Sequence, residues 1–502
     1  MANTSQPSQH ETQQLIQQLN GGHLVAAEQT AKILITKHAD TFILHHVLAL
    51  ALDGQQKFLE SIPSYQKALK LQPNNADLHF NLGIALGNVN QFDEALSAYQ
   101  KAINLKPNFF EAHGNLGTVF QRLGMLDEAI SSYKKGLSIN PQDARGHFNL
   151  GTALRDKGNL PEAITSYQQA IALFPNYTDA YNNLGETQRD YGDMDAAIKN
   201  YQAALSRNPD HPNANYNMGE FCYLAKQYSE AASYFEHSQF DDWQARQMYS
   251  LYKAERFDDF KSTLDHVTKT TRHTSPFIAT LATHYAINFE AEHHYNFCQN
   301  GVDYVYKNSI PTLADPNSAL RKQLLHDIEH ADIAERVQGM LHYGKQSAGN
   351  LFKRPEASFQ QLAALIIQEF KHYKNHFSQS DCELIQSFPD ELEFTSSWYV
   401  NMQQGGHLNA HIHEIGWISG AVYLAMPEPN GNEGAFEYGT HGDGYPIQAS
   451  KTKSDFPASY TLPTVGDIVL FPSSLFHRTI PFQADEKRIC VAFDLKPNPP
   501  TA

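Results

Sequence analysis

Prolines recur at a fixed interval through the first half of the chain, and this period constrains the fold more than any other feature. They stand 34 residues apart, at Pro73, Pro107, Pro141, Pro175 and Pro209. Glycines keep the same spacing, at Gly83, Gly117, Gly151, Gly185 and Gly219. Between them come Ala95, Ala129, Ala163, Ala197 and Ala231, followed by Tyr99, Tyr133, Tyr167, Tyr201 and, one position early, Tyr234. A period of this length predicts a solenoid in which each repeat packs only against its neighbours.

Each repeat has the pattern of two amphipathic helices. The small glycine and alanine side chains let neighbouring helices approach closely, and the proline ends the second helix because it has no backbone N–H. One such pair cannot bury its apolar face alone, so pairs stack into a superhelix with a concave groove. The pattern resembles the tetratricopeptide repeat over residues 39–236, with a degenerate first repeat in which Ala49 takes the glycine position. Residues 1–38 are expected to form an N-terminal helical cap.

An asparagine stands two residues before each repeated glycine, and Val47 replaces it in the first repeat. Asparagine is a poor helix former, costing about 0.5 kcal/mol relative to alanine at each site. A ladder of carboxamides on the inner helices could pair with the N–H and C=O groups of an extended peptide. It resembles the asparagine ladder in the repeats of protein O-linked N-acetylglucosamine transferase; the alternative is that Asn-Leu-Gly is merely common in such repeats. The predicted peptide-binding residues are Asn81, Asn115, Asn149, Asn183 and Asn217.

Charge and cysteine content exclude several classes of protein. The net charge of −16 provides no positive surplus for a phosphate backbone, so no nucleic-acid partner is expected. The four cysteines form no CxxC pair, which argues against a zinc ribbon or a disulfide framework. The N-terminus lacks the pattern of a signal peptide, and no apolar run approaches the roughly 18 residues of a membrane span. We therefore expect a cytoplasmic protein with no membrane partner.

Residues 237–345 lose the period but keep helical patterning, as in RQMYSLYKAERFDDFKSTLDHV. They are predicted to form a helical connector that seats the repeats against the C-terminal third of the chain. His326 and His330 lie four residues apart and could bind a metal together, but no third ligand is apparent. We interpret them as solvated helix histidines.

Residues 346–502 change to short strands separated by glycine and proline turns. The stretch EFTSSWYVNMQ alternates and is rich in aromatic and β-branched residues, and GWISGAVYLAMPEP is an apolar strand stopped by prolines. This pattern predicts an antiparallel jelly roll, with an apolar helix at 357–372 packed on its outside. The expected fold class is multidomain: an all-α superhelix followed by an all-β double-stranded β-helix with flanking helices.

Three histidines and an arginine in this region point to metal chemistry. His411 and His413 would face the same side of a strand, because alternate strand residues point the same way. His477 follows a strand and turn that return to the same mouth, and Arg488 lies eleven residues later on the last strand. This order resembles that of Fe(II)/2-oxoglutarate oxygenases. The fragments HIHEIGWISGAVYLAMPEP and PTVGDIVLFPSSLFHRTIPFQADEKRICVAF resemble a bacterial family of such oxygenases often joined to tetratricopeptide repeats.

The resemblance implies a role for each matching residue. His411 and His477 would be imidazole ligands to Fe(II), and Arg488 would form a bidentate ion pair with the distal carboxylate of 2-oxoglutarate. Tyr423 resembles the tyrosine that hydrogen-bonds the same carboxylate in prolyl hydroxylases. Asn401, ten residues before the first ligand, is a candidate for lining the pocket, with a solvent-facing strand residue as the alternative. Molecular oxygen would be the second cosubstrate.

One position departs from the family pattern. The usual second ligand is a carboxylate, whereas this chain has His413, which we predict to be the third metal ligand. A carboxylate from Glu437, or the loop residues His441 and Asp443, remains the alternative. The neighbouring Glu414 should point to the opposite face and His407 should lie at the rim. The stretch GGHLNAHIH also resembles the first cupin motif, although the downstream glutamate is missing; membership of that group would keep the jelly roll and change the cosubstrate.

Three functions are compatible with this organisation. The first is an oxygenase that hydroxylates a protein or peptide substrate presented by the repeat groove. The second is an oxygenase for a small metabolite in which the repeats serve assembly. The third is a non-catalytic repeat scaffold with a cupin-like jelly roll. Oxygen-dependent formation of succinate separates the third from the other two.

Overall fold

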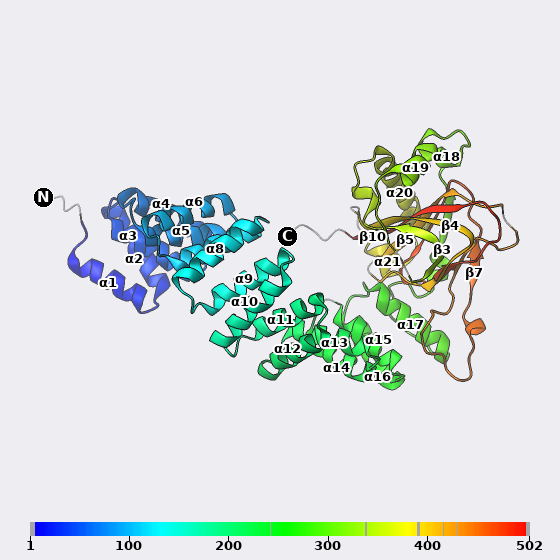
Figure 1. The fold of residues 1–502 in the computed structure, drawn as a ribbon, viewed down its shortest axis with the longest axis horizontal. Helices are drawn as coiled ribbons and strands as arrows, with labels where there is room; N and C mark the ends of the chain where they lie inside the picture. The colour runs from blue at the N-terminus through cyan, green and yellow to red at the C-terminus, as the bar shows by residue number, and fades with distance from the viewer. Residues whose placement is uncertain are drawn as a thin grey trace. The chain divides into compact units, whose positions relative to one another are not determined.

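The computed structural model describes residues 6–240, 242–336, 339–388, 392–414, 416–428 and 430–497. The chain forms two compact units, Met1–Met218 and Gly219–Ala502 (Figure 1). Among the described residues, no helix combines the length and the apolarity needed to cross a membrane.

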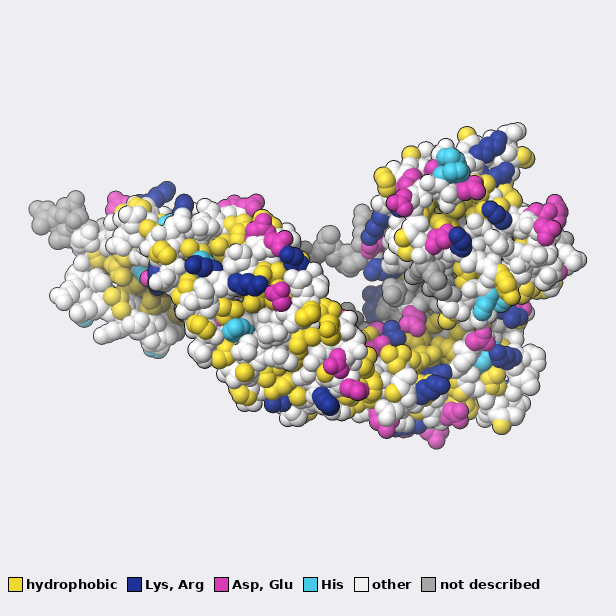
Figure 2. Space-filling model, in the orientation of Figure 1, with side chains coloured by type: hydrophobic (Ala, Val, Ile, Leu, Met, Phe, Trp, Pro, Cys, Tyr) yellow, Lys and Arg dark blue, Asp and Glu magenta, His cyan; other side chains and the backbone are white. Residues whose placement is uncertain are grey.

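The first unit is a stack of antiparallel helix pairs, and each helix from α1 to α11 packs on the next along the chain (Figure 1). Its helices are α1 (Gln9–Asn20), α2 (Leu24–Lys37), α3 (Phe42–Gly54), α4 (Phe58–Leu71), α5 (Ala76–Asn88), α6 (Phe92–Leu105), α7 (Phe110–Arg122), α8 (Leu126–Ile139), α9 (Ala144–Asp156), α10 (Leu160–Leu173), α11 (Thr178–Tyr191), α12 (Met194–Arg207) and α13 (Pro212–Leu224), the last of which crosses into the second unit. Charged side chains of both signs are interspersed over the visible face of these helices (Figure 2). The predicted all-α superhelix is confirmed.

The repeated glycine exists to receive an aromatic ring from the second helix of the same repeat. A Cβ added to Gly117 would lie 2.7 Å from the ring of Tyr133, and one added to Gly185 would lie 2.6 Å from the ring of Tyr201. Any side chain at these positions would therefore separate the two helices. In the last repeat the ring that faces Gly219 belongs to Phe235, at 2.8 Å, and not to Tyr234. The 34-residue period is thus kept, because Phe235 occupies the position that tyrosine takes in the other repeats. Tyr234, which looked displaced in the sequence, is only its neighbour.

The second unit begins with the end of α13 and continues the helical pattern before the sheet. Its helices are α14 (Tyr228–Ser238), α15 (Trp243–Lys253), α16 (Phe257–Thr270), α17 (Pro276–Phe289), α18 (Pro311–Ala314), α19 (Ala319–His330), α20 (Ala357–His376) and α21 (Glu383–Gln386), with short 3-10 turns η1 (Gly301–Tyr304), η2 (Leu351–Lys353) and η3 (Lys453–Asp455). Helix α20, predicted from its apolar stripe, buries Phe359, Leu362 and Ile366 in the same hydrophobic core as the sheet.

One curled antiparallel sheet forms the jelly roll, in the order β1-β8-β5-β10-β4-β9-β6-β7 (Figure 1). Its strands are β1 (Tyr306–Ser309), β4 (Leu392–His411), β5 (Ile418–Ala425), β6 (Phe436–Tyr438), β7 (Ser459–Thr461), β8 (Asp467–Pro472), β9 (His477–Thr479) and β10 (Arg488–Pro497), while β2 (Glu335–Arg336) pairs with β3 (Leu341–Ser347), which also pairs with β4. The predicted all-β jelly roll with flanking helices is confirmed.

The region predicted as a helical connector is not helical throughout. Residues 237–289 are mostly helix, but Tyr306–Ser309 and Leu341–Ser347 are strands of the sheet. The edge of β8 is completed by β1, and β4 is completed by β3 through pairs such as Lys345 with Asn401. Both strands are short and partly exposed, so their sequence carries little of the apolar alternation by which strands are recognised.

The glycine contact predicts opposite effects for two substitutions in one helix. Gly117→Ala should lower the melting temperature of the chain, because the buried Tyr133 ring cannot move aside; such overpacking costs about 1–3 kcal/mol. In Gly114→Ala, three residues earlier in α7, the added Cβ meets nothing within 4 Å. This variant should have a higher melting temperature, because alanine stabilises a helix by about 1 kcal/mol relative to glycine. Thermal melts followed by circular dichroism measure both. Equal melting temperatures for the two variants would mean that the ring contact does not constrain the repeat.

Candidate metal centre

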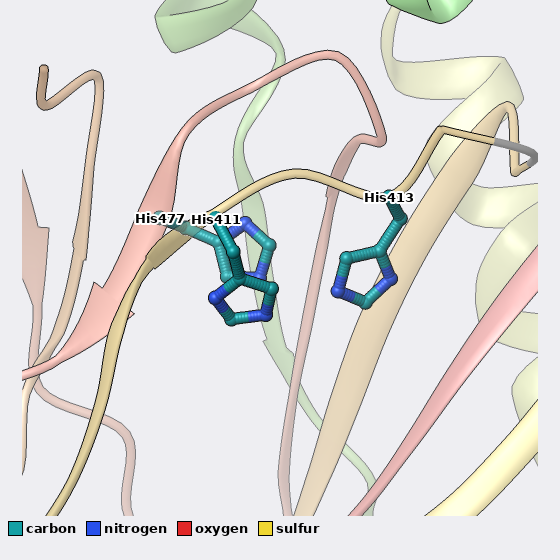
Figure 3. A group of neighbouring side chains, drawn as sticks. All are labelled: His411, His413 and His477. Carbon is teal, nitrogen blue, oxygen red and sulfur yellow. The ribbon is translucent and has the colours of Figure 1, made fainter. Parts of the chain in front are cut away.

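Three histidines meet at one end of the sheet, carried by β4, by the chain just beyond it and by β9. His411 is the last residue of β4 and pairs directly with His477, the first residue of β9. His413 lies two residues past the end of β4, where its backbone N–H donates to the carbonyl of Ser473 at 3.1 Å. The three rings converge on one point (Figure 3), and their ligand nitrogens all lie within 4.8 Å of one another.

Each ring has its Nδ1 occupied by a neighbouring oxygen. The Nδ1 of His411 lies 2.8 Å from the carbonyl oxygen of Asn409, and that of His477 lies 3.0 Å from the carbonyl oxygen of Leu475. The Nδ1 of His413 hydrogen-bonds a carboxylate oxygen of Asp494. A proton on each Nδ1 leaves the Nε2 lone pair of each ring available, which is the tautomer that a metal needs.

Burial keeps the two histidines of the strand pair uncharged. It lowers the pKa of His411 to about 4, with a further contribution from the neighbouring His413. It also lowers the pKa of His477 well below its ordinary value, helped by the two other imidazoles. Neutral imidazoles are the form that binds metal ions, so the site is arranged for a cation near neutral pH.

Asp494 is a member of this centre that the sequence analysis missed. Besides His413, its carboxylate accepts hydrogen bonds from the hydroxyls of Ser396 at 2.6 Å and Ser419 at 2.7 Å. Burial raises the pKa of Asp494, but the interaction with His413 and the serine hydroxyls outweigh it, so the net pKa is lowered. The group is therefore a carboxylate that fixes the orientation of the His413 ring. A signal existed: Asp494 lies six residues after Arg488 on one strand, and alternate residues share a face.

A cavity of about 480 Å³ opens beside the histidines. Arg488 and Tyr423 line it together with the three rings, and both are buried, Arg488 to 2 % exposure. The Arg488 guanidinium lies 5.1 Å from the centre of the Tyr423 ring and donates to the carbonyl of Gly434 at 3.3 Å. Among the described residues, no carboxylate lies within 4 Å of it, so its charge has no protein counter-ion.

Asn401 does not belong to this cavity, contrary to the expectation from its distance to His411. Along β4, Trp398 and Val400 face the cavity, whereas Tyr399 and Asn401 line a separate groove on the other side of the strand. The odd-numbered residues of this stretch point away from the metal centre because successive side chains of a strand alternate.

The alternative carboxylates are engaged elsewhere. Glu437 pairs with Arg478 on the neighbouring strand, and Asp443 lies 2.9 Å from the ammonium of Lys453. Glu414 borders the cavity, but its carboxylate is 3.2 Å from the guanidinium of Arg246 in α15. Among the described residues, only the three histidines form a metal-binding group of three or more side chains.

The remaining candidate histidines lie apart from the centre. The ring of His441 is buried beside His284, with ring centres 5.0 Å apart, and lies next to a second cavity that His284 lines. His407 stacks on His342 of β3 at 4.5 Å. His326 and His330 stack on each other in α19 at 4.2 Å, and no third metal-binding side chain joins them among the described residues.

The asparagines of the repeats lie half-buried on the first helix of each pair. Asn115 hydrogen-bonds the hydroxyl of Tyr99, and Asn183 hydrogen-bonds that of Tyr167. Asn217 is the most occupied, because its amide donates to Asn182 and to Glu186, each at 3.1 Å. A pocket of about 350 Å³ in the first unit is lined by one of them, Asn115, together with Thr118, Arg122 and Arg145.

Comparison with protein families identifies both halves of the chain. Residues 396–494 match the family described as "Putative 2OG-Fe(II) oxygenase". Tetratricopeptide-repeat families match residues 55–90, 88–124, 110–143, 132–165, 151–190 and 188–253. The chain therefore matches tetratricopeptide-repeat families in one region and the "Putative 2OG-Fe(II) oxygenase" family in another, the combination predicted from its motifs. No curated protein matches it.

Solved structures similar to the chain are repeat proteins. YrrB, described as a TPR protein with an unusual peptide-binding site, is 23 % identical and covers 37 % of this chain and 95 % of its own, with a TM-score of 0.33. MamA from Desulfovibrio magneticus RS-1 is 21 % identical, covers 34 % of this chain and 95 % of its own, and has a TM-score of 0.33. A tetratricopeptide repeat protein from Parabacteroides merdae is 18 % identical and covers 48 % and 99 %, with a TM-score of 0.40.

Removal of a ligand ring should remove the metal. We expect His411→Ala and His477→Ala each to abolish Fe(II) binding, and His413→Ala to weaken it strongly, since each loses one of three converging nitrogens. Glu437→Ala should leave the iron stoichiometry unchanged, because that carboxylate is held by Arg478. Iron content after anaerobic loading and desalting measures all four. Full iron content in the His411 or His477 variant would show that these histidines are not metal ligands. Loss of iron in the Glu437 variant would instead indicate that the Glu437 carboxylate is a ligand.

Asp494→Asn should reduce Fe(II) affinity by about 10–100-fold, the usual cost of losing a carboxylate behind a metal-binding histidine. Asp467→Asn is the matched control, because Asp467 is also a buried strand carboxylate but binds Thr464 instead of a ligand. It should lower stability and leave the iron affinity unchanged. Titration of both apo-proteins with Fe(II) under nitrogen decides the matter, and equal losses of affinity would mean that Asp494 has only a structural role.

Proposed function

We propose that this protein is an Fe(II)- and 2-oxoglutarate-dependent oxygenase that hydroxylates a protein or peptide substrate held by its repeats. The observation that supports it most is the buried guanidinium of Arg488, which has no carboxylate partner among the described residues and lies in the same cavity as three clustered imidazoles. A cation site and an anion site in one cavity suit a metal ion together with a small dicarboxylate.

The side chains fit Fe(II). Three Nε2 atoms would hold the metal, and imidazole is a ligand that suits iron. The ligand set itself carries no charge, but Asp494 behind His413 supplies one negative charge through the hydrogen bond. With iron and 2-oxoglutarate bound, molecular oxygen would be the oxidant, 2-oxoglutarate would supply two electrons as it is converted to succinate and carbon dioxide, and one oxygen atom would enter the substrate. The protein's part is to hold these groups in register and to keep water away.

The side chains also fit 2-oxoglutarate. An isolated buried charge costs several kcal/mol, so Arg488 is arranged for an anion that enters the cavity. A planar guanidinium donates two parallel hydrogen bonds to a carboxylate, and the hydroxyl of the neighbouring Tyr423 could donate a third. The apolar side chains of Val400, Phe436 and Phe471 line the remaining wall and exclude water from the reacting groups.

The repeats support a peptide or protein as the substrate. Tetratricopeptide repeats typically bind peptides or proteins, and in this chain a half-buried carboxamide recurs on the first helix of every period. Asn115, Asn149 and Asn183 are the best placed for a peptide backbone, because Asn217 is already bound to Asn182 and Glu186. The pocket beside Asn115 adds two arginines to this surface.

Formation of succinate from 2-oxoglutarate tests the activity. Purified protein loaded with Fe(II) should form succinate only with oxygen present, and the rate should rise when the substrate is added. Substrates can be captured on chelator-stalled protein and searched for a gain of one oxygen atom. Absence of oxygen-dependent succinate would leave a non-catalytic scaffold, whereas succinate coupled to a small molecule alone would leave a metabolite oxygenase.

Arg488→Ala should raise the 2-oxoglutarate requirement with iron binding intact. Breaking a buried charge pair costs on the order of 3–5 kcal/mol, or at least about a hundredfold in affinity. Arg478→Ala is the control, because this arginine lies outside the cavity and is half-exposed. Apparent KM for 2-oxoglutarate measures the effect, and an unchanged value in the Arg488 variant would place the anion site elsewhere.

The triple variant Asn115→Ala, Asn149→Ala and Asn183→Ala should lose substrate and keep the metal. Each lost hydrogen-bonded pair weakens binding by about 0.5–1.5 kcal/mol, so three should cost at least about tenfold in affinity. Iron content and the succinate formed without substrate should be unchanged, and the helices should melt no lower, because alanine is the better helix former. Asn104→Ala, on the exposed side of α6, is the control. If the triple variant hydroxylated a captured substrate as fast as the wild type, the asparagines would be a common feature of such repeats without a role in substrate binding.

A further inference from the structure

Two of the four cysteines, far apart in the sequence, meet in the core of the second unit. Cys298 follows α17 and Cys382 precedes α21, and each is 2 % exposed. The segments that carry them are held together by three hydrogen bonds: the backbone N–H of Glu383 donates to Asn296 at 2.9 Å, that of Leu384 donates to Phe297 at 3.0 Å, and the side chain of Asn296 donates to the carbonyl of Asp381 at 3.1 Å.

The two side chains share one hydrophobic core and interact across this junction. The interaction with Cys298, together with those from Ser380 and Tyr304, lowers the pKa of Cys382 below its ordinary value, whereas burial raises that of Cys298. Cys382 is therefore the cysteine that favours the thiolate, and Cys298 is the one that keeps its proton and can donate it.

A cavity reaches this pair from outside the metal centre. It has a volume of about 470 Å³, and its lining includes Cys298, Gly301, Leu475 and Phe476. Cys382 is not part of the lining, so of the two cysteines a small molecule in the cavity would meet Cys298 first. The cavity is separate from the one that holds the three histidines, although Leu475 and Phe476 directly precede His477.

We propose that Cys298 and Cys382 are a redox modification site that forms a reversible disulfide with hydrogen peroxide, or a small organic disulfide, as the oxidant. With peroxide, the Cys298 sulfur attacks one oxygen, the O–O bond breaks, hydroxide leaves, and the Cys298 proton passes to the Cys382 thiolate. The Cys382 sulfur then attacks the sulfenic sulfur of Cys298, the S–O bond breaks, and the departing hydroxyl takes the Cys382 proton as water. Two electrons pass from the two sulfurs to one peroxide molecule.

Neither of the other cysteines is arranged in this way. Cys222 lies in α13, and Cys490 lies beside Arg488 at the metal centre. All four are buried and free in the structure. The pair therefore stands out by contact and by access to a cavity, since exposure does not distinguish it from the others.

The test uses the full chain freed of iron by a chelator, so that its outcome is independent of the proposed oxygenase activity. Native protein is treated with hydrogen peroxide, blocked with N-ethylmaleimide and digested without reduction. We expect a cross-linked peptide pair that contains residues 298 and 382, lighter by about 2 Da than the sum of its parts and separated again by dithiothreitol. In the denatured protein the number of alkylated thiols should fall from four to two.

Cys298→Ser and Cys382→Ser should each abolish the cross-link, and Cys222→Ser, the matched buried cysteine, should retain it. The wild-type peptide map needs no variant, so a variant that fails to fold leaves the proposal testable. Four alkylated thiols after peroxide treatment would overturn it. So would oxidation of Cys298 or Cys382 to sulfinic acid without a cross-link, or a cross-link that joins Cys222 or Cys490 instead.

Discussion

Strand β4 sets the register on which the whole metal centre depends. It pairs with β3 on one side and with β10 and then β9 on the other. The pairing with β9 puts His411 opposite His477, and the pairing with β10 puts Arg488 opposite Met402. A slip of one residue in either pairing would turn the side chains to the other face of the sheet. Backbone hydrogen bonds thus fix the three histidines and Arg488 at a set separation around one cavity.

The charged groups around the three histidines include a carboxylate that hydrogen-bonds one ring and an arginine elsewhere in the same cavity. Two imidazoles are neutral because burial disfavours their protonated form, and the carboxylate of Asp494 lies behind His413. The one permanent cation, Arg488, is buried against an aromatic ring and sulfur atoms. This arrangement favours a divalent cation beside the histidines and an anion beside the guanidinium, and it disfavours the reverse.

The sequence was informative wherever a period or a motif reported on geometry. The 34-residue period predicted the helix pairs, and the order His411, His413, His477 and Arg488 predicted four residues that line one cavity. The sequence did not predict features that depend on which strands lie side by side. Asp494 reaches His413 only because β10 lies beside β4, and Asn401 is turned away by the phase of a strand whose start could not be placed. The strands β1 and β3 take their structure from the sheet edges they complete, and nothing local to them specifies it.

The second unit begins inside a repeat, and this has a practical meaning for anyone who wishes to divide the protein. Ala232 of α14 belongs to the same continuous core as residues of the sheet such as Val422 and Leu495. A catalytic fragment that started after the last recognisable repeat would therefore lose part of its own interior. Gene fusions that exchange one repeat array for another should join upstream of Pro212, so that the final helical pair travels with the sheet. The last repeat is in this sense the first piece of the scaffold that holds the candidate site.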